Sequence, residues 1–101
     1  FQLWQIATVT EDVLVAILDT GIDPDHQDLN GLIIAEANFT DNSSPADSYG
    51  HGTHVAGIIA AKNDGTGIVG VAPGCRLLNV KVADDMGRCQ ASALAEGIIW
   101  A

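Results

Sequence analysis

Three short apolar segments are separated along the chain by polar and helix-like stretches. The run VLVAIL (13–18) is continuous and rich in branched side chains, which is typical of a strand buried on both faces of a parallel sheet. GLIIAEANF (31–39) and CRLLNVKVA (75–83) have the composition of a second and a third strand. Between them lie turn-forming residues, so the sequence predicts three strands that are not joined by tight hairpins.

Two further segments are predicted to be helical. The first begins at His51, within GHGTHVAGIIAA, and is expected to run to about Lys62. The second is expected from Ser92 onward, with three large apolar side chains facing the sheet: Leu94, Ile98 and Ile99. Strands that alternate with helices predict an α/β fold with a parallel sheet, and no linker or repeat divides residues 1–101, so we expect one domain.

Charge narrows the classes of partner. The chain has 13 acidic and 4 basic side chains and a net charge of −9, which argues against nucleic acid or an anionic membrane as a partner. The apolar runs are also far too short to span a bilayer. A cation or an uncharged or cationic partner suits this composition better.

The two cysteines are too few for a disulfide framework. Cys75 begins the third predicted strand and Cys89 lies beyond its far end. Eight extended residues span roughly 26 Å, whereas a disulfide needs Cα atoms within about 7 Å. We therefore expect Cys75 and Cys89 not to pair with each other.

Candidate chemistry gathers around one aspartate and one histidine. In a parallel sheet, functional side chains collect at the carboxyl ends of strands, and Asp19 stands directly after the first predicted strand. His51 opens the first predicted helix after a glycine, so its imidazole can point toward the same edge. A carboxylate that binds one imidazole nitrogen fixes the tautomer and supports an imidazolium. The pair is two thirds of a nucleophilic triad, whose third member must come from elsewhere.

Other interpretations of these residues are open from spacing alone. His51 and His54 lie three positions apart on one helix face and, with an aspartate, would make a zinc site. Asp19 by itself is also compatible with an ordinary turn, and His51 with a helix start that is satisfied by solvent or backbone.

Four motifs resemble those of the subtilisin-like serine peptidases. They are LDTGID (18–23), HGTHVAG (51–57), GVAP (70–73) and NVKVADDMG (79–87), and the aspartate precedes the histidine as in that family. The resemblance covers nearly the whole chain. It implies a three-layer α/β/α sandwich of which this chain is the N-terminal portion. The first three strands would lie side by side, and a left-handed crossover would carry the histidine helix.

The resemblance also implies roles for single residues. Asp19 would orient the base, His51 would be the general base, and His54 would be a structural neighbour. The nucleophilic serine of the family lies in a Gly-Thr-Ser motif farther along the chain, and none of the four serines here occurs in such a motif: Ser43, Ser44, Ser48 and Ser92. The sequence thus predicts an endopeptidase whose N-terminal part is inactive alone. The alternative is a non-catalytic fragment or peptide-binding module.

Further sites follow from the resemblance in the same way. A peptide or protein substrate would pair with the segment containing Gly87, Arg88 and Cys89. The C-terminal part of the catalytic domain would be a second partner, and the location would be extracellular. A calcium ion would bind the carboxylates of Asp28 and Asp64 and backbone carbonyls near Lys62, Thr66 and Ile68, because calcium prefers oxygen ligands.

Overall fold

The computed structural model describes residues 13–62 and 69–101. It contains three strands and two helices in alternation: β1 (Leu14–Asp19), β2 (Ile33–Asn38), α2 (His51–Ala60), β3 (Arg76–Lys81) and α3 (Ala91–Trp100). The predicted α/β fold is confirmed. Each predicted element is present, with ends that differ from the predicted ones by two residues at most.

The three strands form one parallel sheet in the order β1-β3-β2. In this sheet Asp19 of β1 and Asn38 of β2 are both register partners of Lys81 of β3. The carboxyl ends of all three strands therefore lie side by side along one edge. β3 is the central strand, and β1 and β2 each pair with it on one side.

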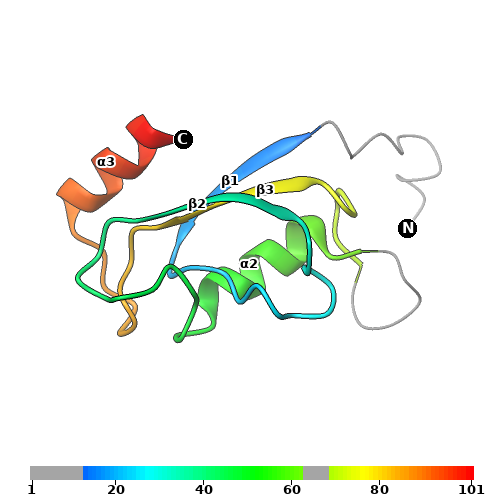
Figure 1. Ribbon diagram of the computed structural model, residues 1–101, viewed down its shortest axis with the longest axis horizontal. Helices are drawn as coiled ribbons and strands as arrows, with labels where there is room; N and C mark the ends of the chain where they lie inside the picture. Colours follow the sequence, from blue (N-terminus) through cyan, green and yellow to red (C-terminus); the bar gives the residue numbers. More distant parts are fainter. Residues whose placement is uncertain (1–12, 63–68) are drawn as a thin grey trace.

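The helices cover opposite faces of the sheet, which makes three layers (Figure 1). The core cluster that includes α2 consists of eight buried residues: Ile17, Ile22, Leu29, Leu32, Ala56, Ala60, Cys75 and Leu77. A smaller cluster on the α3 side consists of Val80, Val82 and Ala93. The chain thus has the three-layer arrangement that the resemblance implied.

The prediction for α3 is wrong about which face packs on the sheet. Ala93 and Gly97 are the buried residues of this helix, whereas Ile98 is 61% and Ile99 83% exposed. The reason is steric: a Cβ atom on Gly97 would lie 2.6 Å from Cγ1 of Val82, so only small residues fit where the helix crosses the sheet. Leu94, at 40% exposed, points mostly outward too.

The prediction that β1 is buried on both faces also needs correction. Only Ile17 is buried in this strand, and Leu14 is 51% exposed. β1 is an edge strand among the described residues, so the side chains at its start have few neighbours to pack against. Within the same described ranges, no helix is long and apolar enough to cross a membrane.

Both cysteines are free, as the spacing predicted. Cys75 is fully buried in the core and Cys89 is exposed. Burial raises the pKa of the Cys75 thiol, and a backbone hydrogen bond offsets only part of this effect.

Candidate active site

Asp19 and His51 form the centre of the site. The Nδ1 atom of His51 lies 2.8 Å from Oδ1 and 2.9 Å from Oδ2 of Asp19. A carboxylate can only accept hydrogen bonds, so Nδ1 carries the proton and Nε2 is left as the basic nitrogen. The Asp19 side chain is 16% exposed and that of His51 is 61% exposed, so the pair presents its imidazole outward.

The position of His51 is set by the residues just before α2. Gly50, the N-cap residue, adopts a left-handed conformation with φ of 107°, which a glycine tolerates best. Asp47 then acts as the side-chain cap: its Oδ1 accepts the Gly50 N–H at 2.7 Å and its Oδ2 accepts the Thr53 N–H at 2.8 Å. Two otherwise unpaired amides at the start of the helix are satisfied in this way.

Thr20 ties the end of β1 to the same carboxylate. Its hydroxyl donates to Oδ1 of Asp47 at 2.9 Å and accepts the Gly52 N–H at 2.9 Å. Its own N–H donates to Oδ1 of Asp19 at 2.7 Å. Thr20 therefore contacts the carboxylates of Asp19 and Asp47 and the helix that carries His51.

Electrostatics at Asp47 agree with this role. Burial raises the pKa of the Asp47 carboxyl, but hydrogen bonds from Gly50, Thr53 and Thr20 outweigh the burial, so the pKa lies below its usual value of 3.8. The carboxylate stays charged next to the positive end of the α2 dipole, which favours a negative group there.

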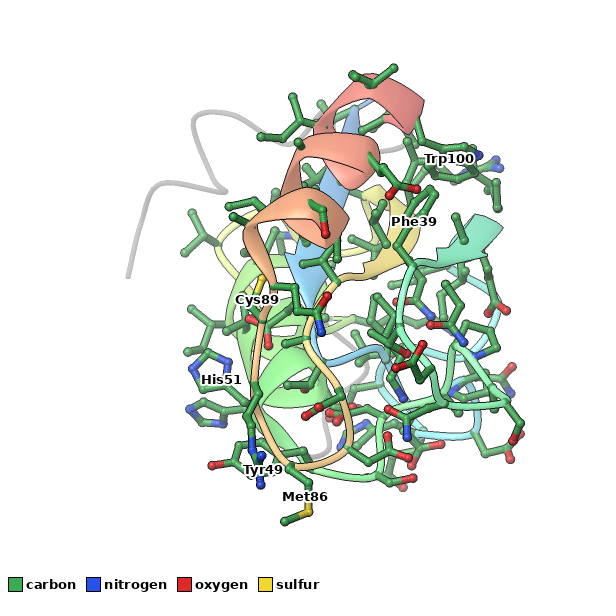
Figure 2. All side chains as sticks on the ribbon, turned by 90° about the vertical axis from the view of Figure 1, so that its left-hand side faces the viewer. Phe39, Tyr49, His51, Met86, Cys89 and Trp100 are labelled. Atoms are coloured by element: carbon green, nitrogen blue, oxygen red, sulfur yellow. The ribbon has the colours of Figure 1, made fainter. Side chains whose placement is uncertain are left out.

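An open pocket of about 450 Å³ lies in front of the imidazole. It is lined by Leu18, Asp19, Thr20, Tyr49, His51, Val82, Ala83, Gly87, Cys89 and Leu94. Figure 2 shows Cys89, His51 and Tyr49 on one side of the molecule. The wall opposite His51 comes from residues 83–89, which fold back on themselves through an antiparallel bridge between Ala83 and Cys89, and which we call the 83–89 hairpin.

The residues predicted to bind substrate are divided by this hairpin. Gly87 and Cys89 line the pocket with His51, whereas Arg88 lines a second, smaller cavity of about 90 Å³ with Asp41 and Asp84. The structure thus brings two of the three predicted residues to the imidazole and places the third on the other side of the hairpin.

The predicted calcium ligands are only partly within the described residues. Asp64, Thr66 and Ile68 lie outside them. Asp28 is 2% exposed, and its Oδ1 has no hydrogen-bond partner there. The backbone N–H of Lys62 donates to the carbonyl oxygen of Asp28 at 3.1 Å, so the start of the predicted ligand loop does lie beside Asp28.

The zinc alternative finds no support in the geometry. His54 is exposed on α2, and Nδ1 of His51 is bound to Asp19. In residues 13–62 and 69–101 no group of three His, Cys, Asp or Glu side chains is placed to hold a metal ion. The resemblance implied that His54 is a structural neighbour of His51. Its side chain is exposed, so it packs less than such a role would require.

Comparison with known proteins decides the family. A sequence profile described as the subtilase family matches residues 10–101. The chain belongs to the subtilase family.

Relatives of this subtilase chain include proteins that are named serine proteases. It is 47% identical to fervidolysin from Fervidobacterium pennivorans over 99% of the chain and 16% of that protein. It is 44% identical to thermitase from Thermoactinomyces vulgaris over 99% of the chain and 36% of thermitase. It is 48% identical to an intracellular serine protease from Paenibacillus polymyxa over 88% of the chain and 29% of that protein. The chain therefore spans about a third of these relatives or less.

Sequence reasoning overlooked two residues of the subtilase site. Asp47 gave only a weak signal, because capping side chains normally stand at the N-cap itself, which is Gly50 here, and Asp47 lies three residues before it. Tyr49 gave no such signal, because its ring lies at the pocket only through contact with Gly87, where a Cβ atom would lie 2.7 Å from Cζ of the tyrosine.

Proposed function

We propose that this chain supplies the acid–base half of a serine endopeptidase site, with Asp19 orienting His51 and His51 acting as general base. One observation carries the proposal: both carboxylate oxygens of Asp19 lie within 2.9 Å of Nδ1, while the ring is exposed toward an open pocket. Membership of the subtilase family and the serine proteases among its relatives support the same chemistry.

In the proposed mechanism, Nε2 of His51 takes the proton of a serine hydroxyl as that hydroxyl attacks the peptide carbonyl carbon. The imidazolium then donates this proton to the leaving amine, and the acyl-enzyme is hydrolysed by water through the same base. Asp19 holds the ring in one tautomer and stabilises the imidazolium charge. The serine would come from the Gly-Thr-Ser motif of the family, which residues 1–101 do not contain.

The proposed substrate is an extended peptide or protein segment along the 83–89 hairpin. Gly87 and Cys89 line the pocket, and an extended peptide bound there would pair with the backbone of the hairpin as an added strand. Arg88 is directed to the smaller cavity, so it would influence the hairpin more than the bound peptide.

The test is covalent labelling by a fluorophosphonate, which reacts with activated serines. The protein that carries this chain together with its Gly-Thr-Ser segment should be labelled, and His51→Ala should abolish labelling. Peptide mapping should place the label outside residues 1–101. Labelling that is equal in the wild type and in His51→Ala would refute the role of His51.

A second candidate is a peptide-binding module without catalysis. It is favoured by the pocket lining, which contains no serine from the described part of the chain. In that case an extended peptide should bind by calorimetry while fluorophosphonate labelling and peptide cleavage are both absent from the whole protein.

We also propose a structural calcium ion next to Asp28. The buried Oδ1 atom without a partner fits this proposal, since burying an unpaired carboxylate oxygen is costly unless a cation or donor satisfies it. Calorimetry with Ca²⁺ should detect binding that Asp28→Asn weakens, and chelation should lower the melting temperature of the wild type more than that of the variant.

The extracellular location implied by the resemblance is part of the proposal as well. One relative is named an intracellular protease, so family membership leaves the location open. Fractionation of the source cells, with detection of the protein in the medium, tests it directly.

A further inference from the structure

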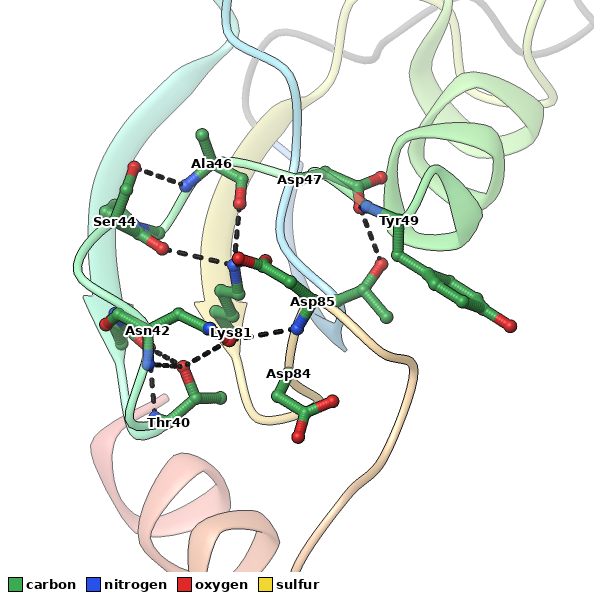
Figure 3. Close-up of polar contacts among 12 residues, drawn as sticks. Thr40, Asn42, Ser44, Ala46, Asp47, Tyr49, Lys81, Asp84 and Asp85 are labelled. Atoms are coloured by element: carbon green, nitrogen blue, oxygen red, sulfur yellow. Dashed lines mark hydrogen bonds and ion pairs between the residues drawn. The ribbon is translucent and has the colours of Figure 1, made fainter.

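A buried lysine forms the carboxyl end of β3, the central strand of the sheet. Lys81 is only 1% exposed, although lysine is rarely buried without partners. Its ammonium group has three N–H donors, and three oxygens surround it: the Ser44 carbonyl at 3.2 Å, the Ala46 carbonyl at 2.8 Å and Oδ1 of Asp85 at 2.5 Å. Figure 3 shows Lys81 between these groups. Every donor is therefore matched by one acceptor.

Two of the three acceptors belong to the 42–50 loop, which leads into α2. Asn79, two residues before Lys81 on the same face of β3, donates from Nδ2 to the Pro45 carbonyl at 2.9 Å. Three successive carbonyl groups of the loop are thus bound by two side chains of the central strand. The next residue is Asp47, the cap that sets the start of α2 and with it the position of His51.

The third acceptor belongs to the 83–89 hairpin, which forms the opposite wall of the pocket. Asp85 binds Lys81 through its side chain and donates its backbone N–H to Oδ1 of Asn42 at 2.9 Å. The hairpin then carries Gly87 and Cys89 to the pocket in front of the imidazole. One ammonium group therefore touches both walls.

We propose that Lys81 is a positioning residue. It fixes the 42–50 loop, which leads into the helix carrying His51, and the 83–89 hairpin relative to each other. The inference rests on the proposed peptidase function, for which the separation between base and peptide-binding wall matters. No other described side chain bonds both the 42–50 loop backbone and a side chain of the hairpin.

The ammonium group matters here because its three N–H bonds can each donate to one of the three acceptors. Methionine has nearly the same shape as the lysine stem, but it would leave two carbonyls and one carboxylate at this point without their donor. Arginine would keep the charge, with a planar group that must find different angles. Lys81→Met therefore removes the link, and Lys81→Arg restores part of it.

The first test is amide hydrogen exchange measured by NMR on the full chain. In Lys81→Met, the amides of Gly50 and Gly87 should exchange at least about tenfold faster, since each reports on one wall. The amide of Leu77, bound to the Leu32 carbonyl within the sheet, should keep its rate. Arg76→Met is the matched control, because it removes an exposed positive charge from the same strand.

Faster exchange in Lys81→Met at only one of the two amides, Gly50 or Gly87, would overturn the inference. Equally faster exchange at the Leu77 amide would overturn it too, because it would show that the whole sheet is destabilised. If Lys81→Met fails to fold, Asp85→Ala decides, because Asp85 is partly exposed and its removal spares the loop bonds. Asp85→Ala removes the bond from Lys81 to the hairpin, so the Gly87 amide should exchange faster while the Gly50 amide keeps a rate close to that of the wild type. An unchanged Gly87 rate in this variant would show that Lys81 does not hold the hairpin in place.

The second test is kinetic and separates this inference from the proposed function. In the protein with its nucleophile, Lys81→Met should lower kcat about 10- to 100-fold with little change in KM, because misplacing a catalytic group by about 1 Å has this effect. Lys81→Arg should recover part of kcat. Absence of turnover in the wild type would refute the peptidase function. The positioning role of Lys81 would then be decided by the hydrogen-exchange result alone. Normal kcat in Lys81→Met would refute the positioning role.

Discussion

Gly52 of α2 lies directly against the backbone of Gly21 after β1. A Cβ atom on Gly52 would lie 2.0 Å from the carbonyl oxygen of Gly21, well inside van der Waals contact. The helix that carries His51 can approach the strand that carries Asp19 this closely because Gly52 lacks a side chain. The 2.8 Å hydrogen bond between His51 and Asp19 depends on this approach.

Gly52→Ala should therefore destabilise the chain by about 3 kcal/mol and lengthen the contact between His51 and Asp19, since a backbone carbonyl cannot move aside. Gly97→Ala is the matched control: its Cβ would meet the ends of Val82 and Val80 side chains, which can shift. It should cost about 1 kcal/mol. Denaturant unfolding of both variants measures the difference, and equal costs would contradict the steric argument.

Asp19→Asn should reduce the rate of fluorophosphonate labelling roughly 10⁴-fold in the protein with its nucleophile, while leaving the fold intact. The amide would hold His51 in the wrong tautomer and would not stabilise the imidazolium. Asp25→Asn, an exposed carboxylate in the loop after β1, is the control and should label normally. A similar loss in both variants would point to net charge as the cause.

Asp47→Asn should lower stability at neutral pH by about 1 kcal/mol, because the cap of α2 is weakened. The pKa of Asp47 is lowered in the folded state, so its contribution is present above about pH 4 and is lost as the pH falls below its usual value of 3.8. The difference between wild type and variant should shrink in this acid range. Asp41→Asn, which is exposed, should show no such trend.

Thiol titration should distinguish the two cysteines. Cys89 is exposed and should react within seconds to minutes with a disulfide reagent in the native protein. Cys75 should react only on unfolding, since burial removes access and raises its pKa, which lowers the thiolate fraction. Cys89→Ser should abolish the fast phase. No reactive thiol in the denatured monomer would show that the cysteines pair after all.

The 101-residue chain by itself should show neither fluorophosphonate labelling nor peptide cleavage. The triad chemistry needs a serine nucleophile, and the serines present lie in no matching motif. Mixing the chain with a separate polypeptide that carries the Gly-Thr-Ser segment should raise its melting temperature and restore labelling. Activity of the chain alone would overturn the proposed assignment of the nucleophile.

The strands and the juxtaposition of Asp19 and His51 were predictable from sequence because local patterns encode them. A continuous apolar run marks β1, and the turn after it places Asp19 at the sheet edge. The glycines on both sides of His51 are visible in the sequence, and Gly52 allows the close approach of α2 to the backbone of Gly21. Each of these features depends on a few neighbouring residues, so it can be predicted without knowledge of the tertiary structure.

The packed face of α3 was not predictable, because hydrophobic periodicity gives weight to large side chains. Here the sheet accepts only Ala93 and Gly97, and the bulky stripe is rotated away. Lys81 was missed for a related reason. A lysine inside a strand gives no hint of its acceptors, which come from residues about 35 positions away and from the hairpin.

The contacts that orient His51 all lie between Asp19 and Asp85, although they join residues up to 43 positions apart along the chain. During synthesis on the ribosome, this stretch can emerge and assemble its imidazole geometry while the serine is still unmade. The order of translation would then separate preparation of the base from arrival of the nucleophile. On the proposed function, the growing chain already holds the Asp19–His51 pair before its serine is synthesised. It therefore cannot cleave its own unfolded segments at that stage.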